Sequence, residues 1–189
     1  ARKGLPRDVP IGTTQPAQRK LRKWRFTEAF GLATWDHLEW RRAGETVRIT
    51  AVPAQHGPAV LHRALPETMG TVVDWERAGQ RRFRLYITGD TLFRRDILGE
   101  IPERFPDIDA ALVHLGGTRI LGVLLTMDGR DGVALSRLIR PRSILPIHYE
   151  DYPVMRDPLA GFLRLADGLP VRTMERGQTV DLAAMSRPM

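Results

Sequence analysis

Hydrophobic and polar residues alternate along several stretches of the chain, which is the pattern of half-buried β-strands. Residues 46–52 alternate in this way, and so do residues 71–75 and 82–88, which are joined by the short polar segment 76–81. Two alternating stretches with a short connection predict a β-hairpin. Further strands are predicted for the apolar run 108–115, for 143–147, and for two short segments near the C-terminus, 171–174 and 179–182.

Helical patterns lie between and beside these strands. Residues 131–138 place Val133, Leu135 and Leu138 at helical spacing, and residues 158–167 predict a second helix that ends before Gly168. Because strands and helices interleave, the sequence predicts an α/β fold, and we expect one domain over residues 1–189.

The amino-acid composition excludes several kinds of catalytic and metal-binding site. The 189 residues contain no cysteine, which excludes disulfides, thiol nucleophiles and cysteine-ligated metals. Any metal site must therefore be built from His, Asp and Glu. No apolar stretch approaches the roughly 18 residues of a membrane span, and no signal peptide is evident, so we expect a cytoplasmic protein without a membrane span.

The net charge of +7 is concentrated at the start of the chain, where residues 1–50 hold 11 basic against 5 acidic residues. The densest segment is 19–25, beside Trp24. Such a segment could release counterions from a nucleic acid, but one basic turn is a weak motif. We favour a solvated helix that is capped by Thr13 or Thr14 and has Pro16 in its first turn, and a nucleic-acid partner is the less favoured alternative.

Three chemically active residues each come directly after a predicted strand and beside a turn. They are His56, Asp90 and His148. In α/β folds the ligand-binding crevice lies beyond the carboxyl ends of the strands, so these side chains are expected to meet at one edge of the sheet. Neutral imidazole and carboxylate are ligands of Zn²⁺, and Mn²⁺ or Fe²⁺ is also admissible.

The segments 53–57 (PAQHG), 88–91 (TGDT) and 146–149 (PIHY) occur in the order of the later metal-binding motifs of the metallo-β-lactamase superfamily. Together with residues 107–128 they resemble its single-domain hydrolases, a group that includes ascorbate-6-phosphate lactonase and N-acyl-phosphatidylethanolamine phospholipase D. The resemblance implies an αββα sandwich and a two-metal site. It also implies that His56 binds the first metal, that Asp90 bridges both and orients the nucleophile, and that His148 binds the second.

The same resemblance implies a metal-dependent hydrolase whose metal-bound hydroxide attacks an ester, lactone, amide or phosphodiester in a small molecule. The family's earlier His-x-His-x-Asp-His motif, which supplies four ligands, is not found before His56. We therefore expect an N-terminally incomplete domain, either a fragment of a longer polypeptide or a naturally shortened product. Such a chain is expected to bind metal poorly by itself.

Three further residues are weaker candidates for substrate contacts. His114 ends the apolar run 108–115, where it either faces the metal crevice or is a core histidine bonded to backbone. Asp128 either supports a ligand or caps the helix over 131–138, and we favour the cap. Tyr149 could donate to a developing oxyanion, although a packed aromatic is the simpler interpretation.

A second hypothesis is a non-catalytic remnant that acts by binding, through the basic segment 19–25. Loss of the family's first strands would also expose a sheet edge and an apolar face, which predicts self-association.

Overall fold

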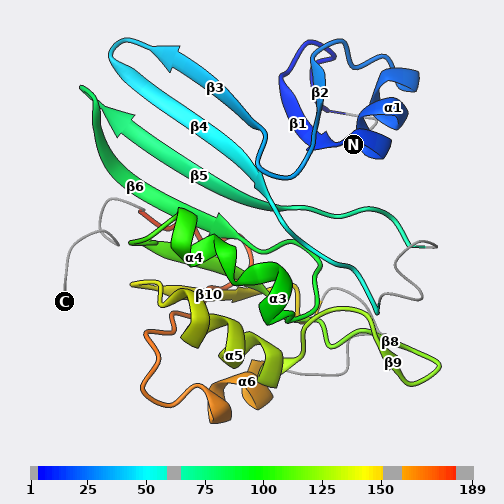
Figure 1. Ribbon diagram of the computed structural model, residues 1–189, viewed down its shortest axis with the longest axis vertical. Coiled ribbons are helices and arrows are strands. Elements are labelled where there is room, and N and C mark those ends of the chain that lie inside the picture. Colours follow the sequence, from blue (N-terminus) through cyan, green and yellow to red (C-terminus); the bar gives the residue numbers. More distant parts are fainter. Residues whose placement is uncertain (1–3, 59–64, 151–158, 182–189) are drawn as a thin grey trace.

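The computed structural model describes residues 4–58, 65–150 and 159–181 (Figure 1). Its centre is a six-stranded mixed sheet in the spatial order β10-β7-β6-β5-β4-β3. The strands are β3 (His37–Arg42), β4 (Glu45–Val52), β5 (Gly70–Arg77), β6 (Gln80–Ile87), β7 (Ala110–His114) and β10 (Ile144–Ile147).

The strands from β3 to β6 form an antiparallel meander, in which tight turns join β3 to β4 and β5 to β6 while the longer segment 53–69 joins β4 to β5. Ala43-Gly44 and Ala78-Gly79 each have positive φ at both residues, which is the two-residue turn that matches the twist of paired strands. The predicted hairpin is therefore confirmed, but its strands run into the segment 76–81 that was expected to be the connection. Strand β3 was not predicted at all.

Strands β6, β7 and β10 are parallel to one another, and helices cover the face of the sheet beside them (Figure 1). The helices are α3 (Arg95–Leu98), α4 (Glu100–Arg104), α5 (Gly129–Ile139) and α6 (Leu159–Leu165). The main core lies between them and the sheet, where Leu135 and Phe162 are buried with Val72, Tyr86 and Val113. Burial raises the pKa of the Tyr86 hydroxyl well above its ordinary value.

The opposite face of the sheet carries a smaller cluster around Phe83, Ala110 and Leu145, which Met174 and Val180 contact. This contact explains why the two strands predicted near the C-terminus are wrong. Within 171–174 only one isolated bridge forms, from Val171 to Ile144, and residues 179–181 form no strand, while residue 182 lies outside the described residues. The apolar side chains of this segment pack on the sheet face instead of extending the ladder.

The N-terminal segment forms a small unit at the upper right of Figure 1, made of β1 (Ile11–Thr14), α1 (Gln15–Lys23) and β2 (Ala29–Leu32). Thr14 caps α1 by accepting a hydrogen bond from the amide of Ala17 at 3.4 Å, and Pro16 lies in the first turn, as predicted. Three basic residues lie in its last turn, where positive charges interact favourably with the negative end of the helix dipole: Lys20, Arg22 and Lys23.

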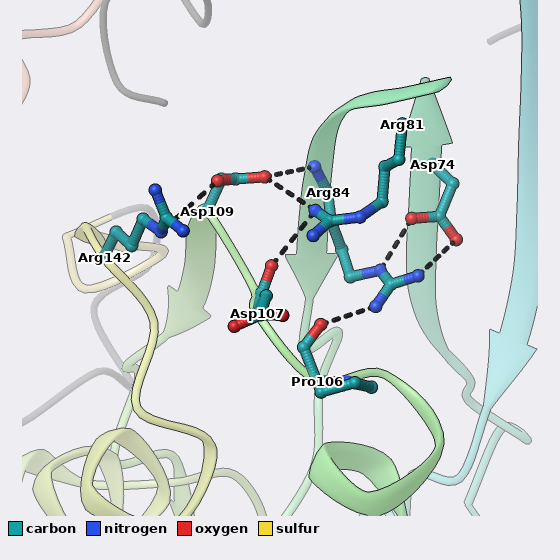
Figure 2. A network of polar contacts seen from close by, with 7 residues as sticks. All are labelled: Asp74, Arg81, Arg84, Pro106, Asp107, Asp109 and Arg142. Atoms are coloured by element: carbon teal, nitrogen blue, oxygen red, sulfur yellow. Dashed lines mark hydrogen bonds and ion pairs between the residues drawn. The ribbon is translucent and has the colours of Figure 1, made fainter. Parts of the chain in front are cut away.

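A buried carboxylate holds the amino-terminal ends of the parallel strands together (Figure 2). Asp109, directly before β7, accepts a hydrogen bond from the backbone amide of Arg84 in β6 at 2.8 Å and from the Arg81 guanidinium at 3.1 Å. Its other oxygen lies 3.6 Å from Nε of Arg142, just before β10. Arg84 also pairs with the buried carboxylate of Asp74 in β5 at 2.6 Å, so one network ties four neighbouring strands.

We expect the variant Asp109→Ala to lose about 3 kcal/mol of unfolding free energy, because it leaves a backbone amide and two guanidinium groups without their shared acceptor. Chemical denaturation measures the change. The control is Asp96→Ala, which removes a carboxylate from the exposed pair with Arg94 and should change stability little. Equal effects of the two substitutions would contradict the assigned role of Asp109.

Candidate metal-binding site

The chemically active side chains gather at the carboxyl ends of β6, β7 and β10. Asp90 follows β6, His114 is the last residue of β7, and His148 follows β10. The three strands are parallel neighbours, and β10 pairs Ile147 with His114, so their ends coincide at one edge of the sheet. Such an edge is where α/β folds bind their ligands.

Asp90 and His148 converge at this edge. Nε2 of His148 lies 3.6 Å from Oδ1 of Asp90, and the ring of His114 lies 5.5 Å from that of His148, tilted by 56°. Thr88 holds His114 in place, since its hydroxyl accepts the His114 backbone amide at 3.0 Å and lies 3.2 Å from Nδ1 of the ring. His114 is therefore anchored to the residue that follows β6, and its ring faces the crevice, while a contact with substrate stays a prediction.

These three residues line an open cavity of about 360 Å³. Its other walls come from the junction of β1 with α1 and from the segment that leads into β5, with the residues Thr13, Thr14, Ala17, Glu67, Thr68 and Met69. Sequence patterns did not predict the N-terminal wall, because nothing local in residues 13–17 indicates which part of the fold they approach.

Two unusual backbone conformations orient the side chains of Asp90 and His148. Gly89 has a φ of +62°, and a Cβ there would lie 2.6 Å from the carbonyl oxygen of Met69, so only glycine fits this turn before Asp90. His148 itself has a φ of +59°, a left-handed conformation that is uncommon for a residue with a side chain. The chain thus turns sharply at the end of β10 and places the imidazole beside Asp90.

His56 lies on a separate loop that is tied to the Asp90 turn. The amide of Gln55 donates to the Thr91 hydroxyl at 2.9 Å, and the amide of Leu92 donates to the Gln55 carbonyl at 2.9 Å. Nδ1 of His56 is buried and has no hydrogen-bond partner in the described part of the chain. A buried nitrogen without a partner is costly, and it suits a group whose partner is a bound ion.

The fit to a metal ion is partial. Within residues 4–58, 65–150 and 159–181, no three His, Asp or Glu side chains lie close enough together to hold one ion. Asp90 and His148 converge as two potential donors, and His56 is a third that does not line the same cavity. These residues have the donor chemistry of a zinc site but do not close a coordination sphere.

The two remaining candidates for substrate contacts, Asp128 and Tyr149, make contacts that stabilise the fold. Asp128 is the N-cap of α5, where Oδ1 accepts the amides of Arg130 and Asp131 at 3.1 Å each, which confirms the favoured interpretation. Burial, with a further contribution from the Asp128 carboxylate, raises the pKa of Asp131. Tyr149 packs against the main core, as the simpler interpretation held, and lines a second cavity of about 520 Å³ that His148 also lines.

A mixed sheet with helices on one face and an Asp–His pair beyond its parallel strands defines an α/β protein whose candidate site lies at the carboxyl edge of the sheet. Residues 1–149 match the model of the beta-lactamase superfamily domain, and the chain belongs to this superfamily, as its motifs indicated. None of its described helices has both the length and the apolar character required to cross a bilayer.

Curated relatives include a UPF0173 metal-dependent hydrolase of Nanoarchaeum equitans, 24% identical over 71% of this chain and 59% of its own length. Another, from Thermococcus onnurineus, is 26% identical over 72% of this chain and 56% of its own. The chain therefore spans less than two thirds of the length of these relatives.

Solved structures show the same fold. The isothiocyanate hydrolase from Delia radicum gut bacteria superposes with a TM-score of 0.74 over 96% of this chain and 70% of its own, at 18% identity. A metallo hydrolase from Ignicoccus hospitalis gives a TM-score of 0.64 over 91% of this chain and 68% of its own, at 24% identity. The predicted α/β fold of the metallo-β-lactamase type is confirmed.

The turn before Asp90 offers a direct test of the site's geometry. We expect Gly89→Ala to lower the unfolding free energy by at least about 2 kcal/mol more than Gly79→Ala. Gly79 has a similar φ of +73°, but no atom lies within 4 Å of a Cβ placed there, so this variant isolates the backbone penalty alone. If thermal or chemical denaturation gave the same loss for both, the close approach to Met69 would not constrain the Asp90 turn.

Proposed function

We propose that the protein is a metal-dependent hydrolase that acts in the cytoplasm on a small molecule and cleaves an ester, lactone, amide or phosphodiester bond. The observation that carries the proposal is the convergence of Asp90 and His148 to 3.6 Å at the end of two parallel strands, inside a cavity. Membership of the superfamily and relatives that are named metal-dependent hydrolases support it.

Asp90 and His148 would hold the metal, and His56 would be a further ligand through a ring nitrogen. Imidazole and carboxylate together favour zinc, and manganese or iron can use the same donors. A divalent metal supplies Lewis acidity when bound, which polarises the bond to be cleaved and makes water a stronger nucleophile near neutral pH.

The chain's own residues contribute orientation. The Asp90 carboxylate lies beside His148 on the wall of the cavity and would accept a proton from a water molecule in that cavity. His114, which Thr88 holds, lines the same cavity and would contact the substrate. Because the chain spans only part of its relatives' length, additional ligands and substrate contacts from outside these 189 residues are part of the proposal.

Metal binding tests the ligand assignment without relying on turnover. We expect Asp90→Asn and His148→Gln each to weaken zinc binding at least about tenfold in calorimetry, and to reduce the rise in thermal stability that zinc produces. His56→Gln should weaken binding in the same direction. The control His37→Gln removes an exposed imidazole on β3 and should bind zinc like the parent.

Hydrolytic activity is the second measurement in this test. The parent, loaded with zinc, is offered chromogenic esters, lactones, amides and phosphodiesters, and hydrolysis of one class should fall in the Asp90 variant and persist in the His37 variant. If zinc binding in the Asp90 and His148 variants matched that of the parent, the metal assignment would be wrong. If the ligand variants lost zinc but no substrate class reacted, the site would stand and the hydrolase function would not.

Self-association stays a prediction. The outermost strand β3 has a free edge in the described part of the sheet, but it carries Glu39, Arg41 and Arg42, and charged side chains oppose edge-to-edge pairing. The Arg48 and Arg41 guanidinium groups hold the pKa of Glu39 below its usual range, so its charge persists into mildly acidic solution. Light scattering measures the mass, and a monomer at all concentrations would contradict the prediction.

A further inference from the structure

Exposed apolar side chains are concentrated in two elements that border one cavity. Six large hydrophobic residues lie exposed in the described part of the chain, and five of them belong to a hairpin and a helix, of which Leu165 itself lines the cavity. Three are on the hairpin of β8 (Arg119–Ile120) and β9 (Val123–Leu124), and two are on α6; the five are Ile120, Leu121, Val123, Leu163 and Leu165. Single exposed apolar residues need no explanation, but a concentration of this kind marks an interaction surface.

The tip of the hairpin is the most unusual part of this surface. Leu121 and Gly122 form its turn with φ values of +49° and +82°, a conformation that normally takes Asn-Gly. A leucine there bears both the strain of a left-handed backbone and complete exposure, since 99% of Leu121 is accessible to solvent. Figure 1 shows the hairpin projecting from the body of the protein. Nothing in the described fold is stabilised by this leucine.

Arginines lie between the hairpin and α6. A cavity of about 520 Å³ is lined by Arg119 of β8, Arg130 of α5 and Arg164 of α6, and Asp128 is the one acidic residue among its described lining residues. The carboxylate of Asp128 already accepts two backbone amides of α5 and lies 3.4 Å from Arg119.

Arg130 and Arg164 are exposed, and neither forms an ion pair with a described residue. The cavity therefore has a positive charge that its own carboxylate does not neutralise. Guanidinium groups converging from three elements suit a phosphate or carboxylate, which they can bind through paired N–H groups.

We propose that this face, made of the β8–β9 hairpin, α6 and the arginine-lined cavity, docks the protein on an anionic lipid bilayer. The cavity takes a lipid head-group phosphate, and the leucine tip enters the boundary between head groups and acyl chains. Aliphatic side chains beside arginines match the layered chemistry of a bilayer surface, apolar below and anionic above. The proposal stands on this surface alone and does not depend on the hydrolase function.

The shape of the surface favours a bilayer over a protein partner. A projecting two-residue turn is convex and would need a matching pocket in a protein, whereas a fluid bilayer accommodates it without one. Protein interfaces are also enriched in aromatic residues, and the five exposed residues here are all aliphatic.

Vesicle flotation tests the proposal directly. The parent should bind vesicles of phosphatidylcholine with 30% phosphatidylserine, about tenfold or more better than vesicles of phosphatidylcholine alone, and binding should weaken as salt is raised. Leu121→Asp should reduce binding about tenfold, and its complete exposure means that the fold is retained. The double variant Arg130→Gln/Arg164→Gln should reduce binding by a similar or larger factor.

Matched controls separate this face from general charge and hydrophobicity. Leu5→Asp changes the one described exposed large hydrophobic residue that lies elsewhere, and Arg42→Gln/Arg82→Gln removes the same charge from the far ends of β3 and β6. Both should bind like the parent.

Three results would overturn the proposal. One is equal binding to neutral and anionic vesicles, or to neither. Another is equal loss of binding in the face variants and their controls. The third is calorimetric binding of inorganic phosphate that depends on Arg130 and Arg164 in a protein that binds no vesicle, which would make the cavity a site for a free anion.

Discussion

The arrangement of the candidate site depends on the parallel pairing of β6, β7 and β10, and the Asp109 carboxylate fixes that pairing at the opposite end of the sheet. Because a strand has a period of two residues, a slip of one residue would turn every side chain to the other face. Asp109 accepts a backbone amide of β6 and lies beside a guanidinium that precedes β10, so it connects the three strands whose far ends carry Asp90, His114 and His148. The register that a buried acceptor sets at one end of the sheet determines how far apart Asp90 and His148 lie at the other end.

The two ends of the sheet consequently differ in how well their polar groups are bonded and in how strained their backbone is. At the amino-terminal end, buried carboxylates meet arginines, and removal of one partner leaves the others unsatisfied. At the carboxyl-terminal end, Gly89 and His148 adopt left-handed conformations and the buried nitrogen of His56 has no described partner. Unfavourable features of this kind persist only when the surrounding structure determines them, and they are typical of ligand sites. The bonded network at the amino-terminal end of the strands therefore helps the fold to retain the strained conformations at the carboxyl-terminal end.

Much of this arrangement could be predicted from the sequence, and the reason differs from one part to another. Alternation in residues 46–52 and 82–88 predicts strands, because a strand that buries one face has apolar residues at every second position of its own sequence. The residues that follow each strand are then expected at the edge of the sheet. Strand β3 was missed because Glu39, Arg41 and Arg42 give it a polar composition, and its conformation comes from pairing with β4 across the Ala43-Gly44 turn. Residues 171–174 alternate but lack a ladder, since Met174 packs on the sheet face. The wall of the cavity near Thr14 depends on contacts distant in sequence.

The charges on the sheet and the charges around the β8–β9 hairpin are arranged differently, and the difference bears on function. Three arginines of the sheet follow one rule, since each lies against a carboxylate: Arg48 with Glu39, Arg84 with Asp74, and Arg81 with Asp109. Around the β8–β9 hairpin and α6 the rule fails, because arginines line a cavity with a single described carboxylate and stand beside exposed leucines. Places where a fold breaks its own local rules are expected to be sites of interaction, since stability alone gives no reason to keep them. An anionic bilayer, the proposed partner, would supply both the negative charge and the apolar layer that this surface lacks in water.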